Sequence, residues 1–363
     1  MKLRPDDYIQ KALISTTSRF VGEYESDALL LAHAWPDFYS RSVSARLNEG
    51  PTSRSAFIFA FETAPFEKKK IGAQLPDYSH MGNLICSYLS VLYGKRFDSH
   101  GLLEGSGFFH VPELSQFNHL CNHMLPQNSH APRVDFNIPL NLVEFSRIES
   151  LLLSNAFDAH FKRTFQGACK FYIQALQNAE TEPEVAYLHL ITAGEILSNF
   201  HNYDKDSLLD DQTREILALI QANIPNGLRI SNFIANRLLQ VKKRFVKTIT
   251  NLIDDGFFTR SEAKEPFGRF KADSFKNSIG AAYDLRSRYV HTGVPFGNWI
   301  SLSLGGINSE VPFGKPVVED DEFEKILAIA PTYVGLERVI RYCLLTFAKQ
   351  NGAYVDGNSE KAK

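Results

Sequence analysis

The side chains best suited to catalysis in this 363-residue chain lie between positions 283 and 293, which read Tyr-Asp-Leu-Arg-Ser-Arg-Tyr-Val-His-Thr-Gly. Arg286 and His291 are separated there by four residues. Cleavage of a phosphodiester by its neighbouring 2′-hydroxyl needs a group that moves protons near neutral pH and a fixed cation beside the phosphate. Histidine and arginine supply these two functions without a metal. We therefore expect His291 to serve as general acid or base and Arg286 to stabilise phosphate charge.

The spacing of these two residues does not by itself place them together. Five residues at about 100° each set Arg286 and His291 roughly 140° apart around an ideal helix. Thr292, Gly293 and Pro295 predict that the helix ends near His291, with Gly293 as a left-handed cap. The same residues also fit a helix with a surface arginine and a C-terminal histidine that only complements the helix dipole.

The segment 281–293, Ala-Ala-Tyr-Asp-Leu-Arg-Ser-Arg-Tyr-Val-His-Thr-Gly, resembles the last motif of the HEPN superfamily, in its ApeA-like branch. In that motif a helix carries a tyrosine, two residues, an arginine, a small polar residue and then a histidine followed by glycine. Thr292 stands where many relatives have the glycine. The resemblance implies a mainly α fold and a metal-independent ribonuclease that cleaves RNA without a cofactor, in defence or stress. It also implies a homodimer in which two copies of the motif share one cleft.

A second segment, Val-Ala-Tyr-Leu-His-Leu-Ile-Thr-Ala-Gly-Glu-Ile-Leu-Ser-Asn-Phe at 185–200, is similar to an earlier helix of that family. Glu195 is its acid and would orient Arg286 or His291. The resemblance, which spans about 150–350, thus implies Arg286, His291 and Glu195 as catalytic residues. Arg288 would hold a flanking phosphate. The other residues expected to contact RNA are Tyr283 and Ser287.

Two other functions remain open at this stage. One is a non-catalytic HEPN module that binds RNA, a nucleotide or a protein partner, in which Arg286 is only an anion contact. The other is a metal-dependent nuclease that uses the cluster from Asp321 to Lys325, although negative residues there also suit the start of the last helix. A ribonuclease of this kind would further need an inhibitory or trigger-sensing partner.

The composition bounds the class of protein. Hydrophobic residues make up 44% and charged residues 22%, as expected for a soluble globular chain. With 39 basic and 41 acidic residues the net charge is −2, so an RNA site has to be local. One local basic run comprises Lys242, Lys243, Arg244 and Lys247, which a solvated helix face explains equally well.

The termini and cysteines predict a cytoplasmic protein that does not enter a membrane. The N-terminal residues are charged and lack the apolar core of a signal peptide, and no run reaches the ~18 apolar residues of a membrane span. Four scattered cysteines without paired spacing fit a reducing compartment.

We expect residues 1–145 to form a smaller α+β domain that senses a trigger or selects the target. Ser-Ala-Phe-Ile-Phe-Ala-Phe-Glu-Thr from Ser55 is a β-type run, and apolar residues at helical spacing follow from Leu84 until Gly94 ends the helix. Proline and glycine in 97–141 indicate long surface loops.

Residues 146–350 are expected to form a HEPN-like helical bundle, and the tail 351–363 to be disordered. An extended arm or short strand is predicted from Trp299. The expected helices are 143–179, 184–201, 208–222, 229–254, 259–268, 274–291 and 320–349.

Metal and nucleotide motifs are incomplete. His119, Cys121, His123 and His130 form a cluster whose first three members would share a strand face, but it lacks a paired zinc motif, and we expect no metal there. The acids of 204–215, namely Asp204, Asp206, Asp210 and Glu215, imitate a calcium loop without its obligatory glycine. A P-loop and a Gly-x-Ser-x-Gly elbow are both missing, which argues against an NTPase or an α/β-hydrolase.

Overall fold

The computed structural model describes twelve stretches of the chain, and the statements below concern these residues alone. They are 8–34, 54–63, 76–105, 108–115, 121–136, 138–154, 156–203, 208–209, 211–238, 241–301, 308–314 and 316–353. Side chains of 235–238 are not described.

The first part of the chain forms one antiparallel sheet, in the strand order β2-β3-β4-β1-β5-β6. The expected strand from Ser55 is confirmed as β4, where Phe57, Phe59 and Phe61 alternate along the strand and are all buried. The strands are β1 (Tyr8–Thr16), β2 (Tyr24–Glu25), β3 (Leu29–His33), β4 (Ser55–Thr63), β5 (Phe97–Gly105) and β6 (Phe108–Phe109).

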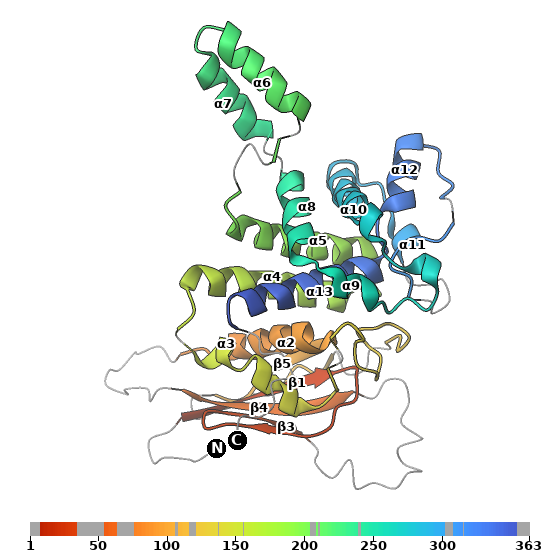
Figure 1. The fold of residues 1–363 in the computed structure, drawn as a ribbon. Helices are drawn as coiled ribbons and strands as arrows, with labels where there is room; N and C mark the ends of the chain where they lie inside the picture. Colours follow the sequence, from red (N-terminus) through yellow and green to blue (C-terminus); the bar gives the residue numbers. More distant parts are fainter. Residues whose placement is uncertain are drawn as a thin grey trace.

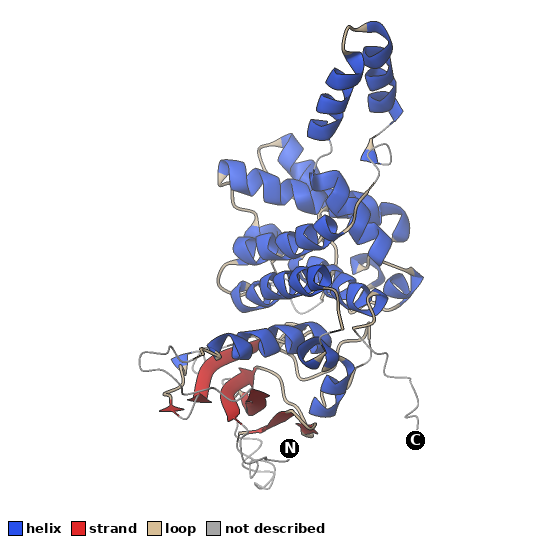
Figure 2. Ribbon diagram, turned by 90° about the vertical axis from the view of Figure 1, so that its left-hand side faces the viewer, coloured by secondary structure: helices blue, strands red, loops and turns tan. Residues whose placement is uncertain are grey.

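The rest of the chain is mainly helical, as expected, and its helices stack in layers above the sheet (Figures 1 and 2). Helix α2 lies directly on the sheet, α4 and α13 form the next layer, and α5, α8 and α10 lie beyond them. The helices are α2 (Ser79–Tyr93), α3 (Ser150–Leu153), α4 (Ala159–Asn178), α5 (Pro183–Phe200), α6 (Asp211–Asn223), α7 (Gly227–Leu238), α8 (Val241–Leu252), α9 (Asp255–Thr259), α10 (Ala272–Thr292), α11 (Gly297–Ile300), α12 (Asp321–Ile329) and α13 (Tyr333–Gln350), with 3-10 turns η3 (Leu142–Arg147) and η5 (Pro266–Gly268).

Helix α13 is the centre of the molecule. It contacts α2, α4, α5 and α8, and 15 of its 18 residues are buried. A helix that is buried around almost its whole circumference is expected only inside a large core. The same hydrophobic core includes Phe57 of the sheet, Tyr172 of α4 and Leu344 of α13, so it runs continuously across the expected boundary near residue 145.

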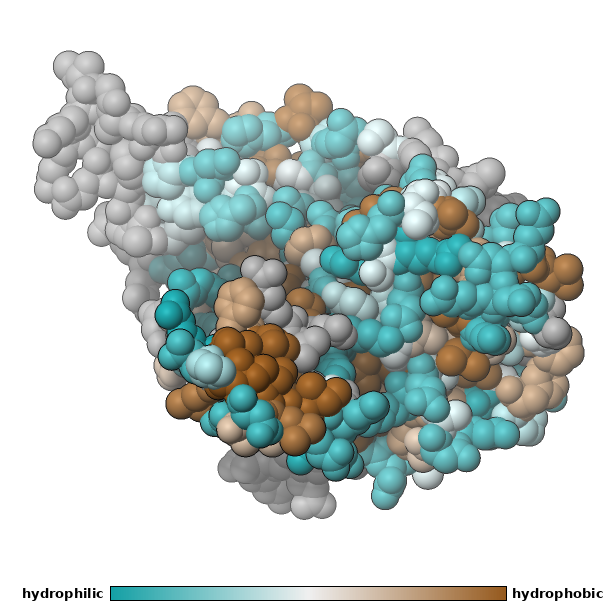
Figure 3. Space-filling model, turned by 90° about the horizontal axis from the view of Figure 1, so that it is seen from above, coloured by the Kyte–Doolittle hydropathy of each residue, from teal (hydrophilic) through white to brown (hydrophobic). Residues whose placement is uncertain are grey.

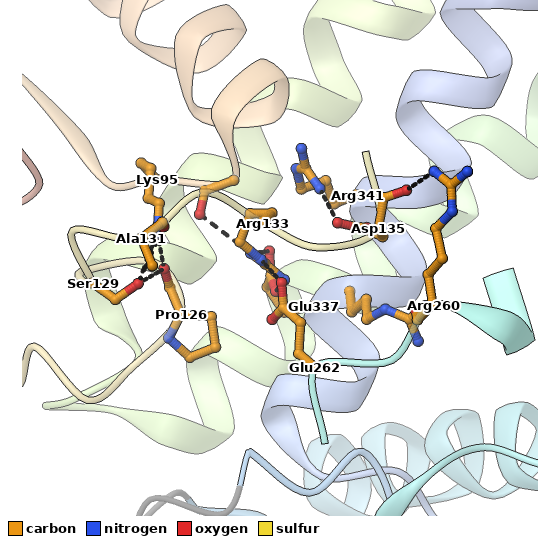
Figure 4. Close-up of polar contacts among 12 residues, drawn as sticks. Lys95, Pro126, Ser129, Ala131, Arg133, Asp135, Arg260, Glu262, Glu337 and Arg341 are labelled. Atoms are coloured by element: carbon orange, nitrogen blue, oxygen red, sulfur yellow. Dashed lines mark hydrogen bonds and ion pairs between the residues drawn. The ribbon is translucent and has the colours of Figure 1, made fainter. Parts of the chain in front are cut away.

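Buried ion pairs join the loop 126–136 to α13 (Figure 4). Arg133 makes a two-bonded pair with Glu337, at 3.0 and 2.7 Å, and a second pair with Glu262 at 2.5 Å. Arg341 pairs with Asp135 at 2.9 Å. Burial alone would raise the pKa of Asp135, but Arg341 and Arg133 hold it below its usual value. These pairs fix how the first 145 residues sit on the helices.

Arg341 also closes the end of α2. Its Nε and second guanidinium nitrogen donate to the carbonyls of Val91 and Leu92, at 2.9 and 2.8 Å. The last carbonyls of a helix lack partners within it, and a cation there also suits the helix dipole. Gly94 ends α2 in the left-handed conformation, with φ 63°, as the sequence predicted.

Several expected helices were wrong in extent. The helix expected at 143–179 is interrupted after Leu153, and α4 starts afresh at the N-cap Asp158. The helix expected at 320–349 is divided because Pro331 cannot continue α12. The one expected at 229–254 is two helices, α7 and α8, which point in different directions (Figure 1).

Three smaller expectations also change. Most of 259–268 is not helical, since α9 ends at Thr259 and only a 3-10 turn follows at Pro266. Trp299 lies in the short helix α11 instead of a strand, and 302–307 lie outside the described residues. Ala353 is buried, so the disordered tail expected at 351–363 does not begin before residue 354. Residues from 354 onward lie outside the described residues.

Helices α6 and α7 form a hairpin that projects from the body (Figure 1). Leu217 and a few neighbours make a small core of their own between the two helices. Apolar side chains nevertheless gather on the surface of the hairpin when it is viewed from above (Figure 3). The exposed large residues are Ile216, Leu219, Ile224, Leu228, Ile230 and Phe233.

Candidate functional site on helix α10

Helix α10 carries the motif that the sequence singled out. It ends at Thr292, and Gly293 follows with φ 70°, its N–H donating to the carbonyl of Tyr289 at 2.8 Å. The expected left-handed glycine cap is therefore confirmed. His291 consequently lies in the last turn of the helix, where backbone carbonyls favour a positive charge.

Three of the predicted residues meet between α10 and α5. The Tyr283 hydroxyl donates to Glu195 Oε1 at 2.9 Å, and a guanidinium nitrogen of Arg286 lies 3.6 Å from Glu195 Oε2. The Arg286 guanidinium also lies 5.6 Å from the centre of the Tyr283 ring. Glu195 therefore contacts both a phenol and a guanidinium, and of the two partners expected for it, Arg286 and His291, Arg286 is the one that lies beside it.

The surroundings of this group restrict its movement. Burial, and then the hydrogen bond to Glu195, raise the pKa of Tyr283 to about 12, so the phenol stays protonated near neutral pH. The Tyr283 ring packs on Phe245 of α8 at 5.5 Å. Phe245 in turn needs Gly194, because a Cβ there would lie 2.4 Å from its ring. The small residue before Glu195 thus lets α8 approach α5.

His291 is not part of this group. Its side chain is exposed, and within the described part of the chain it makes no hydrogen bond or ion pair. The angular separation expected from the spacing explains this, since Arg286 turns toward α5 while His291 lies on another side of α10. One copy of the chain therefore presents a held arginine and a separate, accessible imidazole.

Arg288 turns toward α12 instead. Its guanidinium makes an ion pair of 2.5 Å with Asp320 and lies 4.7 Å from the ring centre of Phe323. The Phe323 N–H, and then Arg288, hold the pKa of Asp320 below its usual value. Arg288 thus links two helices, and an RNA phosphate would have to compete with Asp320 for it. Ser287 is half-buried beside it.

An open groove of about 820 Å³ lies between α8, α10 and α12, and the sequence reading did not find it. Its lysines come from all three helices. The basic run in the sequence of α8 therefore indicated only some of them. Lys242 is bound to both carboxylate oxygens of Asp284, each at 2.6 Å. The lining consists of Leu208, Leu209, Lys242, Lys243, Val246, Lys247, Thr250, Asn251, Lys276, Asn277, Gly280, Ala281, Asp284, Glu322, Lys325, Ile326 and Ile329.

The suspected metal residues are close but do not form a ligand set. Cys121 Sγ lies 3.5 Å from His123 Nε2, and the rings of His123 and His130 are 4.8 Å apart. Burial, and then His123, lower the pKa of His130 to about 4. No group of three or more ligands suited to a metal occurs within the described ranges, and His119 lies outside them.

The acidic clusters have structural roles where they are described. Asp320 caps α12 by accepting from the N–H groups of Glu322 and Phe323, both at 2.9 Å, which confirms that these acids open a helix. Glu215 lies on α6, whereas Asp204, Asp206 and Asp210 lie outside the described residues.

A serine–histidine pair was missed by the sequence reading because its members are 85 residues apart. Ser15 Oγ lies 2.8 Å from His100 Nε2, and His100 Nδ1 lies 2.5 Å from the carbonyl of Glu113. This arrangement matches a nucleophile and its base. Both side chains are buried in the sheet, at 0% and 2% exposure, and burial lowers the pKa of His100. A substrate cannot reach them, so we assign the pair to packing between β1 and β5.

No protein-family model, curated protein or solved structure matches this chain. No helix of the described residues has the length and apolar character needed to span a membrane.

Proposed function

We propose that this protein is a HEPN-like, metal-independent endoribonuclease whose site is built on helix α10. The observation that carries the proposal is the pairing of Arg286 with Glu195, while His291 is exposed in the last turn of the same helix. These are the residue types that cleavage by a 2′-hydroxyl requires, and they match the motif that the sequence resembles.

In this proposal Arg286 is the electrostatic group and His291 the proton carrier. Glu195 contacts one guanidinium nitrogen of Arg286 at 3.6 Å, which leaves other N–H groups for two phosphate oxygens. His291 takes the proton of the 2′-hydroxyl or gives one to the 5′-oxygen that leaves. The products are a 2′,3′-cyclic phosphate and a 5′-hydroxyl. Glu195 and Tyr283 act as positioning residues.

A second copy of the chain completes the proposed site, because Arg286 and His291 of one copy face different ways. The hairpin α6–α7 offers a surface for such pairing. Its six half-exposed apolar side chains leave on the order of 100 Å² each in water. Pairing of two such faces buries roughly 1,200 Å², the lower limit for a specific interface.

The test is cleavage of total RNA in excess EDTA by the full chain, compared with His291→Ala and Arg286→Lys. The exposed His80 of α2 provides the control His80→Ala. We expect both site variants to lose about a hundredfold or more in rate and the control to keep full activity. End-group analysis should find 2′,3′-cyclic phosphates. Full activity of His291→Ala, or dependence on added magnesium, would refute the proposal.

A non-catalytic module that binds RNA is the second candidate. It is favoured by one observation, that His291 has no orienting partner among the described residues. In that case RNA would bind in EDTA without being cut, and His291→Ala would bind it as tightly as the unmodified chain. We further propose that residues 1–145 select the target or sense the trigger in either case.

A further inference from the structure

The groove between α8, α10 and α12, called here the lysine groove, concentrates positive charge on a protein whose net charge is −2. Five lysines and two carboxylates line it. Lys242 is bound to Asp284, and the exposed Lys276 and Lys325 stand against one further lining carboxylate, that of Glu322. An excess of one sign of charge in a hollow focuses the field and attracts ions of the opposite sign.

The type of cation indicates a phosphate ligand. Lysine ammonium groups are compact point charges, which bind phosphate without fixing its orientation, whereas arginine selects planar two-bonded contacts. Lys276 of α10 and Lys325 of α12 both line the lysine groove and are exposed. Lys247 of α8 lies 5.0 Å from the ring centre of Tyr203. Charges spread over three helices suit several phosphates in a row better than a single ion.

Much of the rest of the lining is apolar and suits the non-phosphate part of such a ligand. Val246, Ile326 and Ile329 are part of the lining, together with small residues of α10. The volume, about 820 Å³, is in the range of small-molecule sites and exceeds what one phosphate needs. Its described lining holds no aromatic side chain on which bases could stack, so recognition would depend on the backbone more than on sequence.

The direction of the lysine groove relates it to His291. Asp284 faces this groove, and His291 follows seven residues later on α10. Seven residues are about two turns, so both side chains leave the helix within roughly 20° of each other and about 10 Å apart along its axis. His291 therefore lies beyond the last lining residue of α10, on the same side of the helix as the lysine groove.

We propose that the lysine groove binds the phosphate backbone of single-stranded RNA and leads the strand toward His291. The second half of this statement rests on the proposed ribonuclease function, whereas the binding itself does not. A free nucleotide shares the same phosphate chemistry, and the experiment below separates the two sources.

The test measures binding of a fluorescein-labelled, 12-nucleotide single-stranded RNA by anisotropy in EDTA. All proteins carry His291→Ala, so that cleavage does not disturb the measurement. The groove variant is Lys276→Glu with Lys325→Glu. Its control, Lys170→Glu with Lys264→Glu, changes the charge equally at exposed positions of α4 and the loop after α9.

We expect the groove variant to bind RNA at least tenfold more weakly than the control at 100 mM salt, and to show a smaller salt dependence. The milder variant, Lys276→Gln with Lys325→Gln, should lose less affinity for RNA. Circular dichroism should show that all of these variants are folded alike. Equal affinity of the groove variant and the control would overturn the proposal. ATP that competes fully at a concentration lower than that of the RNA would overturn it in favour of a nucleotide site.

The two proposals can fail separately. If RNA binds in the lysine groove but the chain with an intact His291 does not cut it, the groove assignment stands and the ribonuclease falls. If the groove variant with an intact His291 cuts RNA with an unchanged KM, the ribonuclease stands and the groove assignment falls.

Discussion

Lys95, directly after the cap of α2, is a fully buried cation and should make the stability of the protein depend on pH. Its Nζ donates to the carbonyl of Pro126 at 2.6 Å and to Ser129 Oγ at 3.0 Å, and within the described residues it has no carboxylate partner (Figure 4). Burial, and then the neighbouring Arg133, lower its pKa from 10.5 to about 7. The folded protein thus holds this proton far more weakly than the unfolded chain does.

The direction and size of the effect follow from that difference. Between pH 7 and pH 10.5 the unfolded chain binds more protons at Lys95 than the folded one, so stability rises with pH across this window. Below pH 7 Lys95 is charged in both the folded and the unfolded chain. The folded state then carries the full cost of burying this charge, on the order of 5 kcal/mol at 1.36 kcal/mol per pKa unit. About 2 to 3 kcal/mol of this cost disappears between pH 6 and pH 9.

The perturbation is Lys95→Met, which keeps the apolar stem and removes the charge. The free energy of unfolding in urea is measured for both proteins at pH 6, 7.5 and 9. We expect the variant to be the more stable one at pH 6, and its advantage to shrink by about 2 to 3 kcal/mol at pH 9. Ser129 also donates to Pro126 at 3.3 Å, so that carbonyl keeps a partner.

A difference in stability that does not change with pH would refute this reasoning, because every other titrating group is common to the two proteins. Lys170→Met on the exposed side of α4 is the control and should give no pH-dependent difference.

The remaining predictions concern helix α10. Glu195→Gln keeps an acceptor for Tyr283 but removes the charge, so kcat should fall about tenfold with little change in KM, and ultraviolet titration should find the Tyr283 pKa shifted from about 12 toward 10. If kcat is unchanged, Glu195 does not position Arg286. Gly293→Ala forces a side chain into the left-handed region and should lower stability by about 1 kcal/mol. Gly280→Ala, whose Cβ would meet only Lys242 at 3.7 Å, should instead raise it by up to about 1 kcal/mol, and equal effects of the two would refute the argument from the cap.

The sequence correctly predicted those helices and strands whose ends depend on residues close by in the chain. Gly94 and Gly293 close α2 and α10 because a left-handed residue there has no side chain to strain. The alternation of phenylalanine in β4 follows the two-residue period of a strand. Pro331 is a local signal of the same kind, because proline cannot continue α12 and so separates it from α13. The sequence between α7 and α8 contains no glycine or proline that would mark the end of α7.

The candidate site also combines features that the sequence predicts with features that only the packing of the helices decides. The residue types and spacing of Arg286 and His291 already predicted that one helix would turn them in different directions, since that depends only on helical geometry. That Glu195 holds Arg286 and Tyr283 required α5 to pack beside α10. The sequence could not predict which side chain forms an ion pair with Arg288, because Asp320 is 32 residues away.

The sequence alone determined the chemistry that this protein has available: an imidazole, a guanidinium and a carboxylate in two helices, together with the length and ends of α10. These depend on residue identity and on contacts within a few positions of the chain. Only the tertiary structure decided which of these groups meet, that lysines of three helices line one groove, and that Arg133 and Arg341 join the sheet layer to α13. Such contacts link residues tens to hundreds of positions apart, and they form because burial of the shared core fixes the helices against one another.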